Sequence, residues 1–187
     1  MTIHEYVIFD NIEGISMLLG QNRDINEMDE LGLSPIHYAC YKQSTDMMKF
    51  LLKKGSNPNI VETLFGNSPL HTSILCENAK SAYLLLESGT DKDMKNFNGK
   101  TGLHFCVIQK NIELMKLLLK FRVNLNIQDS RGWTPLHYAT YLGEPEIVEF
   151  LIGYGSDPEI QNNGSVSPML MALMSGNLDV VKIFKGI

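Results

Sequence analysis

The chain has 187 residues, of which 44% are hydrophobic, and its formal net charge at pH 7 is −5. Its 16 basic residues are scattered, which argues against a nucleic-acid-binding surface, because such surfaces cluster Lys and Arg. No apolar run reaches the ~18 residues that a membrane-spanning helix needs, and no signal peptide is visible. We therefore expect an intracellular protein, cytoplasmic or nuclear, with no membrane insertion.

Two landmarks recur along the sequence with the same period. Spacings of 33, 34, 33, 33 and 33 residues separate His4, His37, His71, His104, His137 and Leu170. An apolar pair closes each unit at Leu18-Leu19, Leu51-Leu52, Leu85-Leu86, Leu118-Leu119, Leu151-Ile152 and Ile183-Phe184. A period of about 20 to 50 residues predicts a solenoid, in which each unit packs only on its neighbours.

The residues around the histidines repeat as well. The copies read Ser34-Pro35-Ile36-His37-Tyr38-Ala39, Ser68-Pro69-Leu70-His71, Thr101-Gly102-Leu103-His104 and Thr134-Pro135-Leu136-His137-Tyr138-Ala139. With these motifs the chain resembles the ankyrin repeat family along nearly its whole length. The resemblance implies one all-α ankyrin repeat domain, 1–187, of about six stacked helix-turn-helix units with β-hairpin or turn fingers. The expected units are 1–26, 27–59, 60–93, 94–126, 127–159 and 160–187.

The first two units show how the helices start and end. The first unit resembles an N-terminal cap, and Asn22 stands where glycine ends the helix in other units; Asn tolerates the left-handed conformation of that position. In the second unit Ser34 and Pro35 predict a helix start, because serine caps the helix and proline suits its first turn. That helix is expected to end near Lys42, and Gly55 ends the second helix of the unit.

The third and fourth units depart from the pattern. The turn from Glu62 to Gly66 carries one extra residue, which we expect to push Leu64 or Phe65 outward. Gly102 replaces proline and is expected to loosen its helix start. Arg122 replaces a helix-ending glycine and would be strained if the backbone there is left-handed.

The last two units differ in how closely they follow the repeat pattern. The fifth, Asn126 to Glu159, follows the family pattern most closely. The sixth has lost its histidine, and Val180, Val181, Ile183 and Phe184 leave little polar outer face. We expect either that the natural protein continues beyond Ile187 or that this end packs on another surface, and we favour continuation.

No catalytic or metal-binding constellation is expected. The resemblance implies that the histidines bond to backbone groups and link neighbouring units, and rings roughly 10 Å apart cannot share a metal. No nucleophile elbow, zinc-protease motif or phosphate loop occurs, so we predict neither enzyme activity nor a cofactor. Of three cysteines without CxxC spacing, Cys40, Cys76 and Cys106, the last reads as a small buried hydrophobe, and Cys76 is the candidate if any thiol is reactive.

The candidate site is therefore a surface. The family binds partners through its turns and the exposed face of its first helices, and here we define the inner-helix column as Ile8, Tyr41, Leu75, Ile108, Tyr141 and Met174. The turns add Leu31, Leu33, Phe65, Phe97 and Trp133. One reading has these side chains packed sideways into neighbouring units. The other has them line an apolar concave groove that binds a protein, because monomers seldom expose large apolar patches without a partner.

The predicted function is a non-catalytic adaptor or scaffold, monomeric by itself, that binds an apolar or amphipathic protein segment with basic flanks. The predicted contact residues are Tyr41, Leu75, Ile108, Trp133, Tyr141, Met174, Phe65, Phe97 and Leu33. An alternative is a regulatory or substrate-docking domain of a larger enzyme or channel. A weaker possibility, implied by the family, is hydroxylation of Asn26, Asn59 or Asn126 in the turns.

Overall fold

A computed structural model of the chain describes residues 1–186. The chain divides into two compact units, Met1–Phe97 (unit 1) and Asn98–Ile187 (unit 2). Each unit contains three pairs of helices, and no strand occurs among residues 1–186, so the fingers between the pairs are turns. The predicted all-α solenoid of helix pairs is confirmed.

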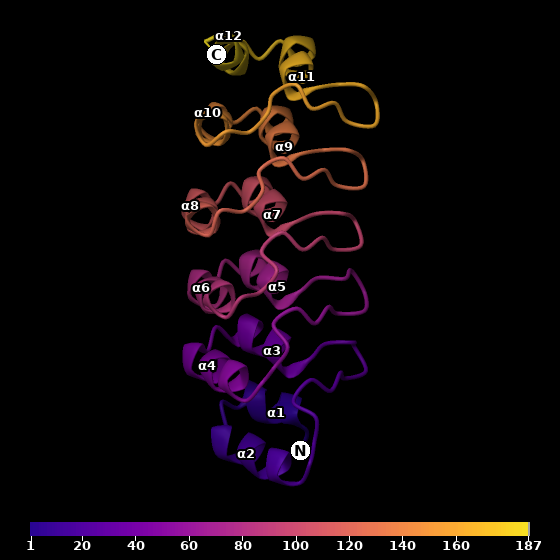
Figure 1. The fold of residues 1–187 in the computed structure, drawn as a ribbon, viewed down its shortest axis with the longest axis vertical. Coiled ribbons are helices and arrows are strands. Elements are labelled where there is room, and N and C mark those ends of the chain that lie inside the picture. The colour runs from indigo at the N-terminus through magenta and orange to yellow at the C-terminus, as the bar shows by residue number, and fades with distance from the viewer. Residues whose placement is uncertain (187) are drawn as a thin grey trace. The chain divides into compact units, whose positions relative to one another are not determined.

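Unit 1 holds the first three pairs in two rows (Figure 1). Its helices are α1 (Ile3–Ile8), α2 (Ile12–Gly20), α3 (Pro35–Lys42), α4 (Thr45–Lys53), α5 (Pro69–Leu75) and α6 (Ala79–Glu87). The first helix of each pair packs on the first helix of the next, and α4 packs on α6. The long turns leave on the side of the first-helix row (Figure 1).

Unit 2 repeats this arrangement. Its helices are α7 (Gly102–Ile108), α8 (Ile112–Lys120), α9 (Pro135–Leu142), α10 (Pro145–Gly153), α11 (Pro168–Ser175) and α12 (Leu178–Lys185). Helix α9 packs on both α7 and α11, and α10 packs on α12. None of the helices within residues 1–186 is both long and apolar enough to cross a bilayer.

The first helices start where the motif predicts. Proline is the first helical residue of α3, α5, α9 and α11, and a serine or threonine precedes it as the N-cap. Helix α7 lacks the proline and still begins at Gly102, because Thr101 pairs with His104 as the N-cap residues of α3, α5 and α9 pair with their histidines. Replacing proline by glycine therefore does not displace this helix start.

The repeated histidines link consecutive helix pairs, as the resemblance implied. In His37 the Nδ1 atom accepts the Ser34 backbone N–H at 3.3 Å, which leaves Nε2 to donate to the carbonyl of Asn67 at 3.1 Å. His104 and His137 make the same two contacts within unit 2, with Nε2 3.0 Å from the next repeat's carbonyl. Both nitrogens of these rings are thus used, and burial lowers the pKa of His37 and of His137.

The backbone at the two helix ends without glycine is left-handed, as expected. Asn22 has φ of 61° and Arg122 has φ of 56°, both in the left-handed region. Asparagine occupies this region more readily than arginine does. The two positions follow the second helix of the first and fourth repeats, so the same backbone conformation costs less at Asn22 than at Arg122.

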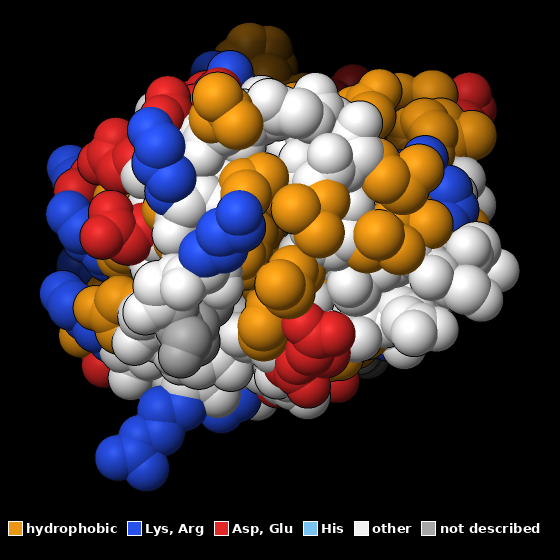
Figure 2. Space-filling model, turned by 90° about the horizontal axis from the view of Figure 1, so that it is seen from above, with side chains coloured by type: hydrophobic (Ala, Val, Ile, Leu, Met, Phe, Trp, Pro, Cys, Tyr) orange, Lys and Arg blue, Asp and Glu red, His pale blue; other side chains and the backbone are white. Residues whose placement is uncertain are grey.

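The last helix corrects one sequence-based expectation. Val180, Val181 and Phe184 are buried, because α12 turns its apolar face toward α10 and α11. The apolar residues exposed at this end are instead Leu170, Leu173, Met174 and Leu178. Figure 2, which looks onto α11 and α12, shows hydrophobic side chains gathered across this face.

Candidate protein-interaction surface

The inner-helix column is exposed at every position. Its side chains are exposed by 36% (Ile8), 52% (Tyr41), 41% (Leu75), 37% (Ile108), 69% (Tyr141) and 72% (Met174). Each column residue lies in the last turn of its first helix, and in the first five of these helices the residue directly before it is buried. The interpretation in which these side chains are packed inside the neighbouring repeats is therefore not supported.

The predicted turn residues are exposed to different degrees. Leu31 is 69% exposed, Phe65 52% and Phe97 66%. Leu33 and Trp133 are half-buried, because each lies at the base of its turn next to the following first helix. In each unit, some of these turn residues and one or two residues of the inner-helix column line an apolar pocket.

The pocket of unit 1, here called the Tyr41 pocket, is a cavity of about 240 Å³. Its apolar wall consists of Leu31, Leu33, Tyr41, Leu64 and Phe65. Of the predicted contact residues, Leu33, Tyr41 and Phe65 are thus brought together here. Leu64 is 70% exposed, and it confirms that the extra turn residue directs apolar side chains outward.

Glu62 holds the turn that forms this wall. Its carboxylate accepts the backbone N–H groups of Leu64 at 2.6 Å, Phe65 at 3.0 Å and Asn67 at 2.9 Å. Although burial acts to raise it, these hydrogen bonds lower the pKa of Glu62 below its usual range. The residue is 4% exposed, so its charge is used inside the turn and is not presented to a partner.

The pocket of unit 2, here called the Trp133 pocket, is a cavity of about 330 Å³ between α7 and α9. Its lining residues are Ile108, Arg131, Trp133, Tyr138, Tyr141 and Leu142. The Trp133 ring lies with its centroid 5.3 Å from that of Tyr141 and 5.0 Å from that of Tyr138, both edge-on. Three predicted contact residues, Ile108, Trp133 and Tyr141, therefore meet in one aromatic pocket.

Asp129 fixes the turn beside this pocket. Its carboxylate accepts the backbone N–H of Arg131 at 2.8 Å, that of Trp133 at 2.9 Å and the Tyr138 hydroxyl at 2.6 Å. Lys100 lies 3.7 Å away. Burial acts to raise the pKa of Asp129, but these groups lower it, so the carboxylate stays ionised.

Arg131 was not among the predicted contact residues. Its guanidinium lies 4.7 Å above the Trp133 ring and donates to the Tyr138 hydroxyl at 2.6 Å. Its side chain is 59% exposed. The sequence does show an arginine two residues before the only tryptophan. The contact of Arg131 with the Trp133 ring, however, depends on the conformation of the turn that Asp129 stabilises.

Leu75, Phe97 and Met174 lie outside these two pockets. Phe97 contacts the extended turn of unit 1, since its backbone N–H donates to the Phe65 carbonyl at 2.9 Å and its ring covers Gly66. Met174 belongs to the apolar end formed by α11 and α12. The structure thus places the predicted contact residues in separate local groups.

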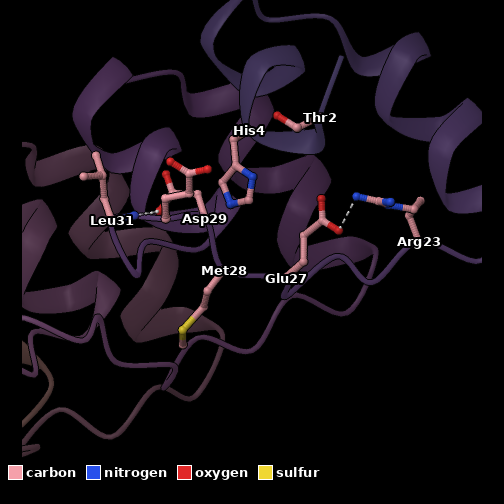
Figure 3. Close-up of a pocket in the computed structure, with 8 residues that line it drawn as sticks. Thr2, His4, Arg23, Glu27, Met28, Asp29 and Leu31 are labelled. Carbon is pink, nitrogen blue, oxygen red and sulfur yellow. Dashed lines mark hydrogen bonds and ion pairs between the residues drawn. The ribbon is translucent and has the colours of Figure 1, made fainter.

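A polar pocket in unit 1 offers different chemistry (Figure 3). It is lined by Thr2, His4, Arg23, Glu27, Met28, Asp29, Glu30 and Leu31. Arg23 pairs with Glu27 at 2.9 Å, and Nε2 of His4 lies 3.0 Å from the Leu33 carbonyl. Arg23, Glu27 and the His4 ring are therefore engaged with the protein itself, and residues 1–186 contain no group of three His, Cys, Asp or Glu side chains that could hold a metal ion.

The cysteines and turn asparagines have structural surroundings. Cys40 and Cys106 are buried, and burial raises the pKa of the partly exposed Cys76, which disfavours its reactive thiolate. Asn26 Oδ1 accepts the Asn57 backbone N–H at 2.7 Å, and Asn126 Oδ1 accepts that of Asp157 at 2.9 Å. These asparagines join one turn to the next.

A family model of ankyrin repeats in three copies matches residues 3–96 and again residues 78–162. The matches cover well over half of the chain, and the chain therefore belongs to the ankyrin repeat family. Such repeats are generally protein–protein interaction modules and are generally non-catalytic.

Individual relatives match parts of the chain. A putative palmitoyltransferase, ZDHHC13, of Danio rerio is 32% identical over 97 residues, which are 51% of this chain and 15% of that protein. Ankyrin repeat protein OPG189 of Variola virus is 32% identical over 87 residues, 46% of this chain and 15% of that protein. Human protein phosphatase 1 regulatory subunit 27 is 35% identical over 55 residues, 29% of this chain and 36% of that protein. The chain thus spans only a minor part of the length of these relatives.

Proposed function

We propose that this chain is a non-catalytic adaptor module inside the cell that binds a segment of another protein through its inner-helix column and the adjoining turns. One observation carries the proposal: all six column positions are apolar, and all six are at least 36% exposed. Exposed apolar side chains cost free energy in water, and contiguous patches of them in soluble proteins mark binding sites.

The aromatic residues in the two pockets support the same function. Tyr41 stands in the Tyr41 pocket, and Trp133 and Tyr141 in the Trp133 pocket. Tyrosine and tryptophan are enriched among residues that carry most of the binding energy at interfaces, because they bury a large area with few rotatable bonds. We expect these three side chains to anchor the partner.

Affinity capture with a matched control tests the proposal. The variant Tyr41→Ala/Trp133→Ala/Tyr141→Ala is compared with Tyr83→Ala/Tyr154→Ala, which removes tyrosines that are 44% and 57% exposed outside the column. After circular dichroism confirms that both are folded, captured proteins are quantified by mass spectrometry. The first variant is expected to lose specific partners that the second retains; equal retention by both contradicts the proposed surface.

A regulatory or substrate-docking domain of a larger enzyme is the second candidate. It is favoured by the match to a putative palmitoyltransferase, of which the chain covers 15%. Reading the coding sequence on both sides of this chain tests it. An adjoining catalytic domain supports this candidate, and a coding sequence limited to these residues contradicts it.

A further inference from the structure

The Trp133 pocket combines apolar walls with a positioned cation, and this combination indicates what it binds. Trp133, Tyr141 and Ile108 supply wall area, and the pocket volume of about 330 Å³ is large enough for a bulky apolar side chain. At one side of the pocket the Arg131 guanidinium carbon lies over the Trp133 ring, 4.7 Å from its centroid. A ligand that fills the pocket therefore contacts rings and a guanidinium together.

Arg131 keeps hydrogen-bonding capacity for a ligand. A guanidinium has five N–H donors, and the side chain makes one hydrogen bond, to the Tyr138 hydroxyl, and a long ion pair of 3.9 Å to Asp129. Stacking on Trp133 and the bond to Tyr138 hold it in place, which reduces the entropy that binding would cost. With 59% of the side chain exposed, the remaining donors are accessible to a partner.

The local charge favours an anionic ligand. The Asp129 side chain is 0% exposed and is already hydrogen-bonded by Tyr138 and two backbone N–H groups, so it offers no accessible negative charge. Lys100 lies 3.7 Å from Asp129 and 5.5 Å from the Tyr138 ring centroid. Arg131 is therefore the exposed cation at this pocket, although the whole chain has a net charge of −5.

We propose that the Trp133 pocket binds an acidic, hydrophobic peptide segment: a bulky apolar side chain packs against Ile108, Trp133 and Tyr141, and a nearby Asp or Glu carboxylate pairs with Arg131. This inference rests on the proposed function and specifies the partner's chemistry at one pocket. It assigns acidic residues to the segment bound here, whereas net charge alone predicted basic flanks. Guanidinium and carboxylate match in geometry and form two parallel hydrogen bonds.

Peptide selection on the whole chain tests the proposal, with the single tryptophan as the reporter. Random twelve-residue peptides on phage, about twelve being enough to span two repeats, are selected and then titrated against Trp133 fluorescence. The expected peptides change this fluorescence and carry Leu, Ile, Met or Phe beside Asp or Glu. Replacing their acidic residue by Lys is expected to weaken binding about tenfold or more, the scale of a charged hydrogen bond.

Charge reversal separates recognition by Arg131 from a purely structural stacking role. Arg131→Glu is expected to weaken the binding of acidic peptides about tenfold or more. The same variant is expected to bind the Lys-substituted peptides more tightly than the original chain does. Lys54→Glu is the matched control, because Lys54 also lies over a ring, that of Phe50 at 5.7 Å, outside the pocket. It is expected to leave binding unchanged.

Four outcomes overturn the proposal: selected peptides rich in Lys or Arg, a preference for phosphopeptides over acidic peptides, indifference to Arg131→Glu, or no enriched peptide. One further outcome contradicts this inference but not the proposed function. In it, the selected peptides leave Trp133 fluorescence unchanged, and Tyr41→Ala abolishes their binding. Peptides insensitive to Tyr41→Ala, Trp133→Ala and Tyr141→Ala together contradict both.

Discussion

The second and fifth repeats use the same turn to build two different pockets, one in each unit. In both, an aspartate, Asp29 or Asp129, accepts a tyrosine hydroxyl and the backbone N–H groups of the turn. The side chains carried by that turn differ, because Leu31 and Leu33 of unit 1 correspond to Arg131 and Trp133 of unit 2. The turn backbone is therefore the same in the two repeats, and the Trp133 pocket has a cation and a tryptophan at the two positions where the Tyr41 pocket has leucines.

The turn backbone is also held by more contacts in the fifth repeat than in the second. The Asp129 side chain is completely buried and has Lys100 at 3.7 Å, whereas Asp29 is only partly buried. Trp133 stacks on His137 with ring centroids 6.0 Å apart. We infer that unit 2 carries the more rigid of the two pockets, and the following predictions test that difference.

The largest expected effect comes from removing the turn aspartates. Asp129→Ala should lower the free energy of unfolding by about 3 kcal/mol, because it leaves the backbone N–H groups of Arg131 and Trp133 and the Tyr138 hydroxyl without their acceptor. Asp29→Ala should cost less, about 1 to 2 kcal/mol, since water can replace the lost acceptor. Urea unfolding measures both, and equal losses would contradict the ranking.

Transferring the two differing side chains sharpens the comparison. In a Trp133→Leu background, Leu31→Arg/Leu33→Trp should create a cationic, aromatic pocket in unit 1 and raise the affinity for acidic peptides about tenfold. Fluorescence of the new tryptophan reports binding there. Leu31→Gln/Leu33→Trp is the control without the charge, and a gain of the same size in that control would show that Arg131 is not needed.

Acid should destabilise the repeats through their buried histidines. Burial lowers the pKa of His37 and His137 in the folded chain below the unfolded value of about 6.5, so the unfolded chain binds more protons there. Stability is then fully present above about pH 6.5 and falls as the pH decreases below it. The melting temperature, followed by circular dichroism, should drop from about pH 7 to about pH 5, and His137→Gln should flatten the curve.

The smallest effects concern the left-handed helix ends. Arg122→Gly should raise the free energy of unfolding by up to about 1 kcal/mol, because φ is 56° there and glycine accepts that angle without strain. Asn22→Gly, at φ of 61°, should gain only about 0.3 kcal/mol, since asparagine tolerates the region. Thermal unfolding measures both effects. An unchanged or lowered melting temperature for Arg122→Gly would contradict the claim that the backbone at Arg122 is strained.

The sequence predicted the fold well because its signals are local and repeated. Ser34-Pro35 and Thr134-Pro135 start helices through capping and fixed proline geometry, and neither depends on distant contacts. The apolar run of α12 was misjudged for the opposite reason. Which face of a short helix is covered depends on how it packs, and α12 directs Val180, Val181 and Phe184 inward.

The candidate site was predicted only in part. The resemblance to the ankyrin family indicated which helix face is exposed, and the period placed Tyr41 and Tyr141 in the same column on it, because equivalent positions share an environment. Arg131 was missed, since its role arises from stacking over Trp133 and bonding to Tyr138. Net charge could not reveal it, because a sum over the chain does not report which charges remain accessible at one pocket.

Site-specific photocrosslinking tests the central claim most directly. A photoreactive phenylalanine analogue is placed at Tyr41 and at Tyr141 in the inner-helix column, and at Tyr83 and Tyr154 outside it, and the crosslinked proteins from living cells are identified. We predict that both column positions crosslink to defined segments of a partner and that the other two do not. Crosslinking to a partner from Tyr83 and Tyr154, with none from Tyr41 and Tyr141, would contradict the assignment of the binding surface.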